Sequence, residues 1–134
     1  MRQYIDTGAL IALIAGSDRH HDAANEYYAE AATRGVRFVL GRPVLVEFLD
    51  GVTKRISKRE GIRQLHAIEG SARLTVEPDL EDDLRRGREL FLKYDDHEID
   101  ITDSLSFAIA ERLGIKEVFT FDPDFAVHGF TVRP

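Results

Sequence analysis

The chain has 134 residues, of which 43% are hydrophobic and 31% are charged. This composition is typical of a folded globular domain and argues against disorder, so we expect one domain spanning residues 1–134. The absence of cysteine excludes disulfides, zinc–thiolate sites and iron–sulfur clusters. The net charge of −6, taken alone, argues against nucleic-acid binding, because binding to phosphate favours a positive surface.

The amino terminus predicts neither secretion nor membrane insertion. Met1–Asp6 lacks the charged-then-apolar layout of a signal peptide. The longest apolar stretch, Ala9–Ala15, is far shorter than the ~20 residues that span a bilayer. We therefore expect a soluble, cytoplasmic protein without a membrane partner.

The first forty residues show strand, helix, helix and strand patterns in turn. Arg2–Ile5 predicts a short strand, and Thr7–Ala15, apolar almost throughout, predicts a buried helix. Ser17-Asp18 is a candidate cap for a second helix that ends near residue 33, before a glycine. Val36–Leu40 is rich in β-formers and predicts the second strand.

Two helices and a strand are predicted next. Gly41-Arg42-Pro43 opens a helix, with proline in the first turn, that ends near Ser57. Lys58–Ser71 is predicted to be helical, and Leu74–Val76 predicts the third strand.

The last part of the chain continues this alternation. Pro78–Tyr94 and Thr102–Leu113 are predicted helices, the second ended by a glycine. Glu117–Phe121 predicts the fourth strand, Asp122–Phe125 a turn or helix start, and Phe130–Val132 the last strand. Strands that alternate with helices of this length favour right-handed crossovers. The predicted fold class is α/β, three-layer α/β/α with a central, mainly parallel sheet of four to five strands.

Four carboxylates stand out by their positions: Asp6, Glu47, Asp103 and Asp122. Asp6 and Asp122 directly follow predicted strands, and Asp103 lies in the first turn of a predicted helix. Ligands bind at the carboxyl ends of the strands in an open parallel sheet. None of the four has a lysine or arginine within two residues, so the expected counter-charge is a bound divalent metal.

Helix capping is the competing interpretation of the three aspartates. Aspartate is favoured at helix caps, where its charge suits the positive end of the helix. Asp6, Asp103 and Asp122 could each cap or flank a helix without meeting the others. Asp100 and Asp124 are further acids that could complete the site in place of Asp122.

Glu47 is the only charge in the apolar run Val44–Leu49. On a helical wheel of roughly 100° per residue, it lies at the edge of a predicted buried stripe. The stripe is formed by Val44, Leu45, Phe48, Leu49 and Val52. A solvated flank is the alternative, but the neighbouring Val46 is apolar, so we expect this flank to be partly covered and Glu47 to face a cleft.

Sites made of carboxylates select hard cations, Mg²⁺ or Mn²⁺. Two such ions ~3.5–4 Å apart can activate a water and stabilise the leaving oxygen of a phosphodiester, although one ion remains an alternative. The hydroxyls of Thr7, Thr102 and Ser104 stand beside the acids and could orient waters or simply cap helices. These residues predict metal-dependent hydrolysis at a phosphate.

Two further features stay open. The basic run Thr53–Arg59 could grip an RNA backbone or be a solvated helix end. His20-His21 lacks metal-ligand spacing, so we expect these histidines to have surface or capping roles.

Four segments of the chain resemble the acidic signatures of PIN-domain ribonucleases: Tyr4–Leu10, Val46–Leu49, Ile101–Ala108 and Phe119–Phe125. Their order and spacing are most similar to those of small bacterial or archaeal toxins of the VapC type. The resemblance implies a Mg²⁺- or Mn²⁺-dependent endoribonuclease that cleaves RNA, is inhibited by a cognate antitoxin protein and forms a homodimer. It implies that the catalytic, metal-binding acids are Asp6, Glu47, Asp103 and Asp122.

Two other functions compete with this one. A scaffold of the same fold could bind RNA or protein without cutting. A phosphatase of the haloacid-dehalogenase kind would use Asp6 as a covalent nucleophile, but such enzymes usually carry a second aspartate two residues later, where this chain has Gly8.

Overall fold

The computed structural model describes all 134 residues and contains a five-stranded parallel sheet with the strand order β3-β2-β1-β4-β5. The strands are β1 (Arg2–Ile5), β2 (Arg37–Gly41), β3 (Leu74–Glu77), β4 (Glu117–Phe119) and β5 (Thr131–Arg133). The helices are α1 (Thr7–Ile14), α2 (His21–Thr33), α3 (Arg42–Arg55), α4 (Lys58–Glu69), α5 (Glu81–Lys93), α6 (Ile101–Arg112) and α7 (Asp124–Val127). The predicted fold class is confirmed.

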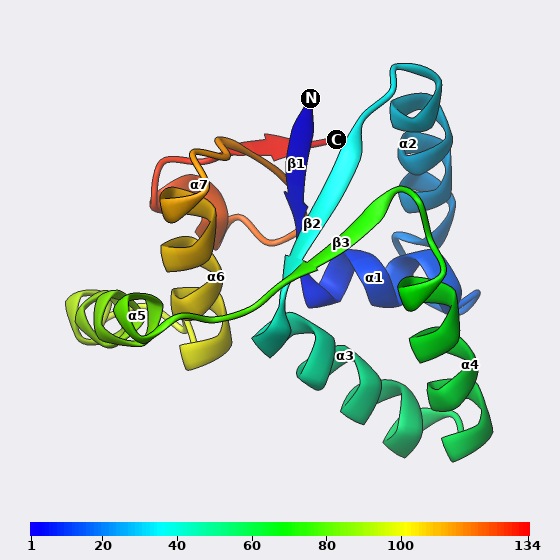
Figure 1. The fold of residues 1–134 in the computed structure, drawn as a ribbon, viewed down its shortest axis with the longest axis horizontal. Coiled ribbons are helices and arrows are strands. Elements are labelled where there is room, and N and C mark those ends of the chain that lie inside the picture. Colours follow the sequence, from blue (N-terminus) through cyan, green and yellow to red (C-terminus); the bar gives the residue numbers. More distant parts are fainter.

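The connections between strands divide the helices between the two faces of the sheet. The chain steps from β1 to β2 and β3 in one direction and then returns across the sheet to β4 and β5. Right-handed crossovers in opposite directions cover opposite faces. Figure 1 accordingly shows α1, α2 and α4 on one side of the strands and α5, α6 and α7 on the other. The strand order reverses between β1 and β4, and at such a switch point the carboxyl ends of the strands open a crevice.

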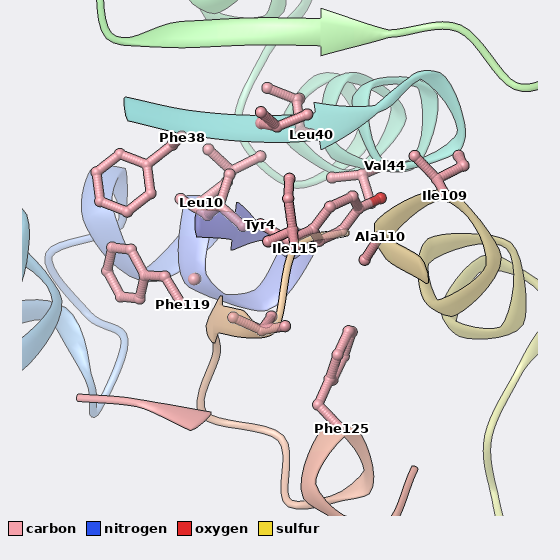
Figure 2. Packing of buried hydrophobic residues seen from close by; sticks show 14 of the residues in the cluster. Tyr4, Leu10, Phe38, Leu40, Val44, Ile109, Ala110, Ile115, Phe119 and Phe125 are labelled. Carbon is pink, nitrogen blue, oxygen red and sulfur yellow. The ribbon is translucent and has the colours of Figure 1, made fainter. Parts of the chain in front are cut away.

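The core is built around the central strands, which are buried on both faces. Tyr4 and Ile5 of β1, Phe38 of β2 and Phe119 of β4 have no exposed surface. Figure 2 shows Tyr4, Phe38 and Phe119 packed with residues of the helices, and the Tyr4 hydroxyl beside Val44 and Ile109. Strands covered on both faces need continuous apolar runs, which explains their sequence pattern.

The hydroxyl of Tyr4 joins three elements below the carboxyl ends of the strands. It donates to Ser106 Oγ on α6 at 2.9 Å and accepts from the Gly41 backbone N–H at 3.0 Å. A Cβ atom at position 41 would lie 2.7 Å from this hydroxyl, so only glycine permits the approach. Burial raises the pKa of Tyr4 well above its usual range, so the hydroxyl stays protonated and donates.

Three predicted boundaries are wrong, two of them because a polar side chain accepts a hydrogen bond from the backbone. Helix α2 begins at His21 rather than at Ser17-Asp18, since Asp18 Oδ1 accepts from the His20 N–H at 2.8 Å and forms a turn. Helix α5 begins three residues after Pro78, where Asp83 Oδ2 accepts from the Leu80 N–H at 2.8 Å. Strand β4 ends two residues early, at Phe119.

No helix of the chain is long and apolar enough to cross a membrane.

Candidate active site

A cleft of about 500 Å³ opens at the carboxyl edge of the sheet, where the strand order reverses. All four predicted site acids line it, although they come from four separate segments of the chain. Seven carboxylates line the cleft in total: Asp6, Asp18, Glu47, Glu98, Asp100, Asp103 and Asp122. The fold therefore concentrates negative charge that the sequence distributes over more than one hundred residues.

Asp6 follows β1 and is the N-cap residue of α1. Its Oδ1 accepts from the Ala9 N–H at 2.8 Å, and its Oδ2 accepts from the Thr120 hydroxyl at 2.5 Å. The residue is only 7% exposed. Burial raises the pKa of Asp6 to about 6, and the charges of Asp122 and Glu47 add to this effect, while the two hydrogen bonds oppose it. No cation compensates the carboxylate.

Asp103 and Asp100 together form a capping box at the start of α6. Asp100 Oδ1 accepts from the Asp103 N–H at 2.8 Å, and Asp103 Oδ2 accepts from the Asp100 N–H at 3.4 Å. Burial raises the pKa of Asp103 well above its usual range, and the charges of Asp100, Asp122 and Asp6 raise it further. Both residues line the cleft. Capping is thus an additional role of these acids rather than an alternative to the shared cleft.

Asp122 lies after β4, in a turn that its own side chain stabilises. Its Oδ1 accepts from the Asp124 N–H at 2.9 Å. Burial raises the pKa of Asp122, and the neighbouring charge of Asp124 contributes to the rise. Asp122 and Asp100 line the cleft, whereas Asp124 is not among its lining residues.

Thr120 forms hydrogen bonds with two of these acids, and it was not singled out from the sequence. It is 1% exposed, donates to Asp6 Oδ2 and accepts from the Asp122 N–H at 3.0 Å. The sequence signal that could have found it is a hydroxyl at the end of an apolar strand, two residues before Asp122.

Glu47 lines the cleft from α3 and is itself exposed. The predicted buried stripe is confirmed at Val44, Phe48 and Val52, which are 1% exposed. The prediction that the flank beside Glu47 is partly covered is wrong, because Val46 is 55% exposed. The side of α3 on which a residue lies, rather than the apolar character of that residue, determines whether it is exposed to solvent.

The three hydroxyls beside the acids have different surroundings. Thr7 Oγ1 is buried without a hydrogen-bond partner, and both Thr7 and Thr102 line the cleft. Ser104 Oγ donates to the Asp100 carbonyl at 3.0 Å and has the helix-end role. A buried hydroxyl without a partner is unfavourable by about 1–3 kcal/mol, so Thr7 points to a ligand or water in the cleft.

The donor set fits a hydrated Mg²⁺ or Mn²⁺ ion. Nowhere in the chain do three or more acidic or histidine side chains converge tightly enough to hold a metal by themselves. Mg²⁺, however, keeps several waters and is commonly held by one or two carboxylates together with substrate phosphates. Asp6, Asp103 and Asp122 are partly or fully withdrawn from solvent without a cation, and the unpaired Thr7 hydroxyl can accept a hydrogen bond from a metal-bound water.

Part of the basic run and one histidine also reach the cleft. Arg55, from the end of α3, lines it together with Arg19 and His20. His20 occupies the N-cap position of α2, but its side chain makes no capping hydrogen bond.

Comparison with known proteins gives one family and a common fold. Residues 3–130 match the PIN domain. The chain is 28% identical over 132 residues, 98% of both chains, to the 23S rRNA-specific endonuclease VapC20 of Mycobacterium tuberculosis. The crystal structure of that protein, a sarcin–ricin loop cleaving toxin, superposes with a TM-score of 0.88 at 27% identity over 100% of each chain.

Two more distant structures share the fold. VapBC2 from Rickettsia felis, bound to a promoter DNA fragment, superposes with a TM-score of 0.75 at 18% identity, over 99% of this chain and 98% of that one. A toxin–antitoxin complex from Klebsiella pneumoniae gives 0.69 at 17% identity, over 98% and 96%. The resemblance seen in the sequence is confirmed.

Proposed function

This chain belongs to the PIN-domain family, and we propose that it is a VapC-type endoribonuclease, the toxin of a toxin–antitoxin pair, which hydrolyses RNA phosphodiester bonds in the cleft described above. The observation that carries this proposal is the convergence of Asp6, Glu47, Asp103 and Asp122 on one cleft, where none of the four forms an ion pair with a lysine or arginine. Phosphodiester hydrolysis suits a site that gathers charge and leaves it to be balanced by a cation and a substrate.

The four acids would hold Mg²⁺ or Mn²⁺. When bound, such an ion supplies a water of lowered pKa and neutralises charge on the phosphate. The chain's own contribution is orientation: Thr120 and the Ala9 N–H hold the Asp6 carboxylate in one position, and the Asp100–Asp103 capping box holds Asp103 at the start of α6. Thr7 Oγ1 remains available to orient a water.

Ribosomal RNA is the substrate class that we propose, because the similar VapC20 is named for cleavage of 23S rRNA. A cognate antitoxin and assembly as a homodimer belong to the same proposal through the VapC resemblance. The match to the PIN domain over nearly the whole chain disfavours the phosphatase alternative, whose second aspartate position is Gly8.

The test compares Asp6→Asn with wild type on ribosomal RNA in the presence of Mn²⁺, with Mn²⁺ binding followed by calorimetry. We expect Asp6→Asn to lose cleavage and to weaken Mn²⁺ binding. Asp22→Asn, an exposed aspartate on α2 away from the cleft, is the matched control and should retain both. Full activity of Asp6→Asn would refute the assignment, and wild-type protein that neither cuts nor binds Mn²⁺ would favour the scaffold alternative.

A further inference from the structure

An aromatic pair lies in the wall of the same cleft. The rings of His20 and Phe121 are stacked, with centroids 4.2 Å apart and planes inclined by 3°. His20 comes from the connection between α1 and α2, and Phe121 follows β4, yet both residues line the cleft. Phe121 directly precedes Asp122, so the pair stands beside one of the proposed site acids.

This pair differs from the other stacked pairs of the protein. Tyr28 stacks on Phe38 and His128 stacks on Phe107, and in both cases the phenylalanine is completely buried. Those pairs are part of the hydrophobic packing. Neither His20 nor Phe121 is buried, so their pair leaves aromatic surface accessible in the cleft.

Both rings are held in place before any ligand arrives. The backbone N–H of His20 donates to Asp18 Oδ1 at 2.8 Å, which fixes the chain at this residue, and the ring Nε2 accepts from Arg19 Nε at 3.1 Å. Phe121 packs edge-on against the buried Phe119, with centroids 6.1 Å apart. A surface already held in its binding conformation loses little conformational entropy when a ligand binds.

Two arginines in the cleft are free to bind anions. Arg19 and Arg55 form no ion pair with any carboxylate, although seven carboxylates line the same cleft. Seven other arginines do pair with carboxylates: Arg34, Arg42, Arg63, Arg85, Arg86, Arg112 and Arg133. A guanidinium group without a carboxylate partner is suited to bidentate contact with phosphate, and the Arg19 bond to His20 uses only its Nε.

We propose that the His20–Phe121 pair is a nucleobase subsite: it stacks an unpaired base close to the scissile phosphate, while Arg19 and Arg55 contact neighbouring phosphates. The combination of stacking rings and free cations is how proteins bind single-stranded nucleic acid. A base inside a duplex is stacked on both faces, so this subsite favours a nucleotide in a loop or bulge. The inference rests on the proposed endoribonuclease function and adds the residues that choose the cleavage position.

The test combines protein and RNA changes in a double-mutant cycle. The cut is first mapped on ribosomal RNA, and synthetic hairpins with an abasic site at each of the positions flanking the cut are then compared by single-turnover cleavage and by a binding titration. At one position, removing the base should weaken binding to the wild-type protein about tenfold to a hundredfold. The same abasic site should not weaken binding further in Phe121→Leu or His20→Ala. His20→Phe, which keeps a stacked ring, should regain most of the affinity for intact RNA that His20→Ala loses.

Control variants separate stacking from folding and from charge. Tyr28→Leu disrupts a stacked pair outside the cleft and should leave the abasic effect unchanged. Arg55→Gln should weaken the binding of intact and abasic RNA equally and should reduce the salt dependence of binding. Arg88→Gln, on the exposed face of α5 outside the cleft, should change neither.

The outcomes also separate this inference from the proposed function. If wild type cleaves, Asp6→Asn does not, and every abasic site affects Phe121→Leu and His20→Ala as much as wild type, the subsite is refuted and the nuclease assignment stands. If no RNA is cut by wild type, the proposed function itself fails. Should Phe121→Leu not fold, as judged by thermal unfolding, the His20→Ala and His20→Phe pair still decides the result.

Discussion

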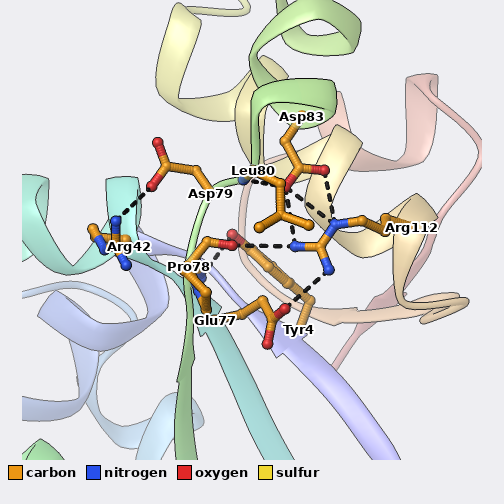
Figure 3. Close-up of polar contacts among 9 residues, drawn as sticks. Tyr4, Arg42, Glu77, Pro78, Asp79, Leu80, Asp83 and Arg112 are labelled. Carbon is orange, nitrogen blue, oxygen red and sulfur yellow. Dashed lines mark hydrogen bonds and ion pairs between the residues drawn. The ribbon is translucent and has the colours of Figure 1, made fainter.

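The protein contains two kinds of buried carboxylate, and they differ in whether the chain supplies a cation. Asp83 on α5 is 2% exposed and accepts three hydrogen bonds from Arg112, from Nε at 3.0 and 3.1 Å and from Nη2 at 3.0 Å. Arg112 Nη1 also donates to Glu77 Oε1 at 2.9 Å and Nη2 to the Pro78 carbonyl at 3.1 Å, as Figure 3 shows. Asp6 is 7% exposed and has only the Thr120 hydroxyl and the Ala9 N–H as donors.

This contrast separates a structural acid from one that we propose to be functional. The Arg112 cluster is electrostatically complete and joins α6 to α5 and β3. The cleft acids are left incomplete, since burial raises the pKa of Asp6, Asp103 and Asp122 and no cation opposes the rise. An incomplete site is less stable by itself and is completed by what binds to it.

The largest effect is expected at the incomplete site. Asp103→Asn should reduce RNA cleavage by about a thousandfold or more, because metal-assisted charge stabilisation contributes several kcal/mol to the transition state. The free energy of unfolding of the metal-free protein should stay the same or rise, since the variant relieves repulsion with Asp100, Asp122 and Asp6. Single-turnover cleavage and urea unfolding measure the two quantities. Wild-type cleavage by Asp103→Asn would remove this residue from the site.

The opposite result is expected at the complete cluster. Arg112→Met should lower the free energy of unfolding by about 3–5 kcal/mol, because it leaves the buried Asp83 without its partner. Cleavage per folded molecule should change little, since Arg112 does not line the cleft. Urea unfolding and cleavage normalised to the folded fraction test this pair of outcomes. An unfolding free energy equal to wild type would show that the cluster is not structural.

The raised pKa of Asp6 should also make the stability of the protein depend on pH. A carboxyl with a raised pKa binds its proton more tightly in the folded state, so the free energy of unfolding falls as pH rises from about 4 to about 7. With the Asp6 pKa at about 6 instead of 3.8, this loss is about 3 kcal/mol in metal-free protein. Asp6→Asn should remove that part of the pH dependence, as measured by urea unfolding in the presence of a chelator. Equal slopes in wild type and Asp6→Asn would contradict the assigned shift.

The smallest effect is expected at Thr120, which supports the site without facing a ligand directly. Thr120→Val keeps the shape but removes the donor to Asp6 Oδ2 and the acceptor for the Asp122 N–H. Groups that orient metal-binding carboxylates typically contribute 10- to 100-fold, so we expect cleavage and Mn²⁺ affinity to fall by about tenfold. Thr120→Ser, which retains the hydroxyl, should recover most of the loss. A serine variant as weak as the valine variant would point to packing instead.

Local sequence patterns were sufficient to place most of the elements and to single out four acids that line the cleft. The apolar strands and the proline-initiated α3 lie within one or two residues of their predicted positions, because burial and backbone geometry act over short stretches. The starts of α2 and α5 were misplaced where Asp18 and Asp83 bond the backbone at a distance of two or three residues. These contacts are also local, but several polar side chains near each turn could bond the same backbone groups, so the sequence does not show which one does.

Partners distant in the sequence could not be inferred in the same way. Asp83 has Arg85 two residues away, yet its partner is Arg112, and Arg85 pairs with Asp82 and Glu81 instead. The exposure of Val46 and the bridging role of Thr120 likewise depend on neighbours that only the packed helices and strands bring near.

Residue order alone was enough to predict an α/β fold, four unpaired acids and a resemblance to PIN-domain nucleases. These features depend on secondary-structure propensity and on the spacing of charges, which involve residues close together in the chain. That these acids share one cleft with Arg19, Arg55 and the His20–Phe121 pair was decided by the reversal of strand order between β1 and β4. Crossover direction is set by how whole helices pack on the sheet, which is a property of the folded chain rather than of any segment.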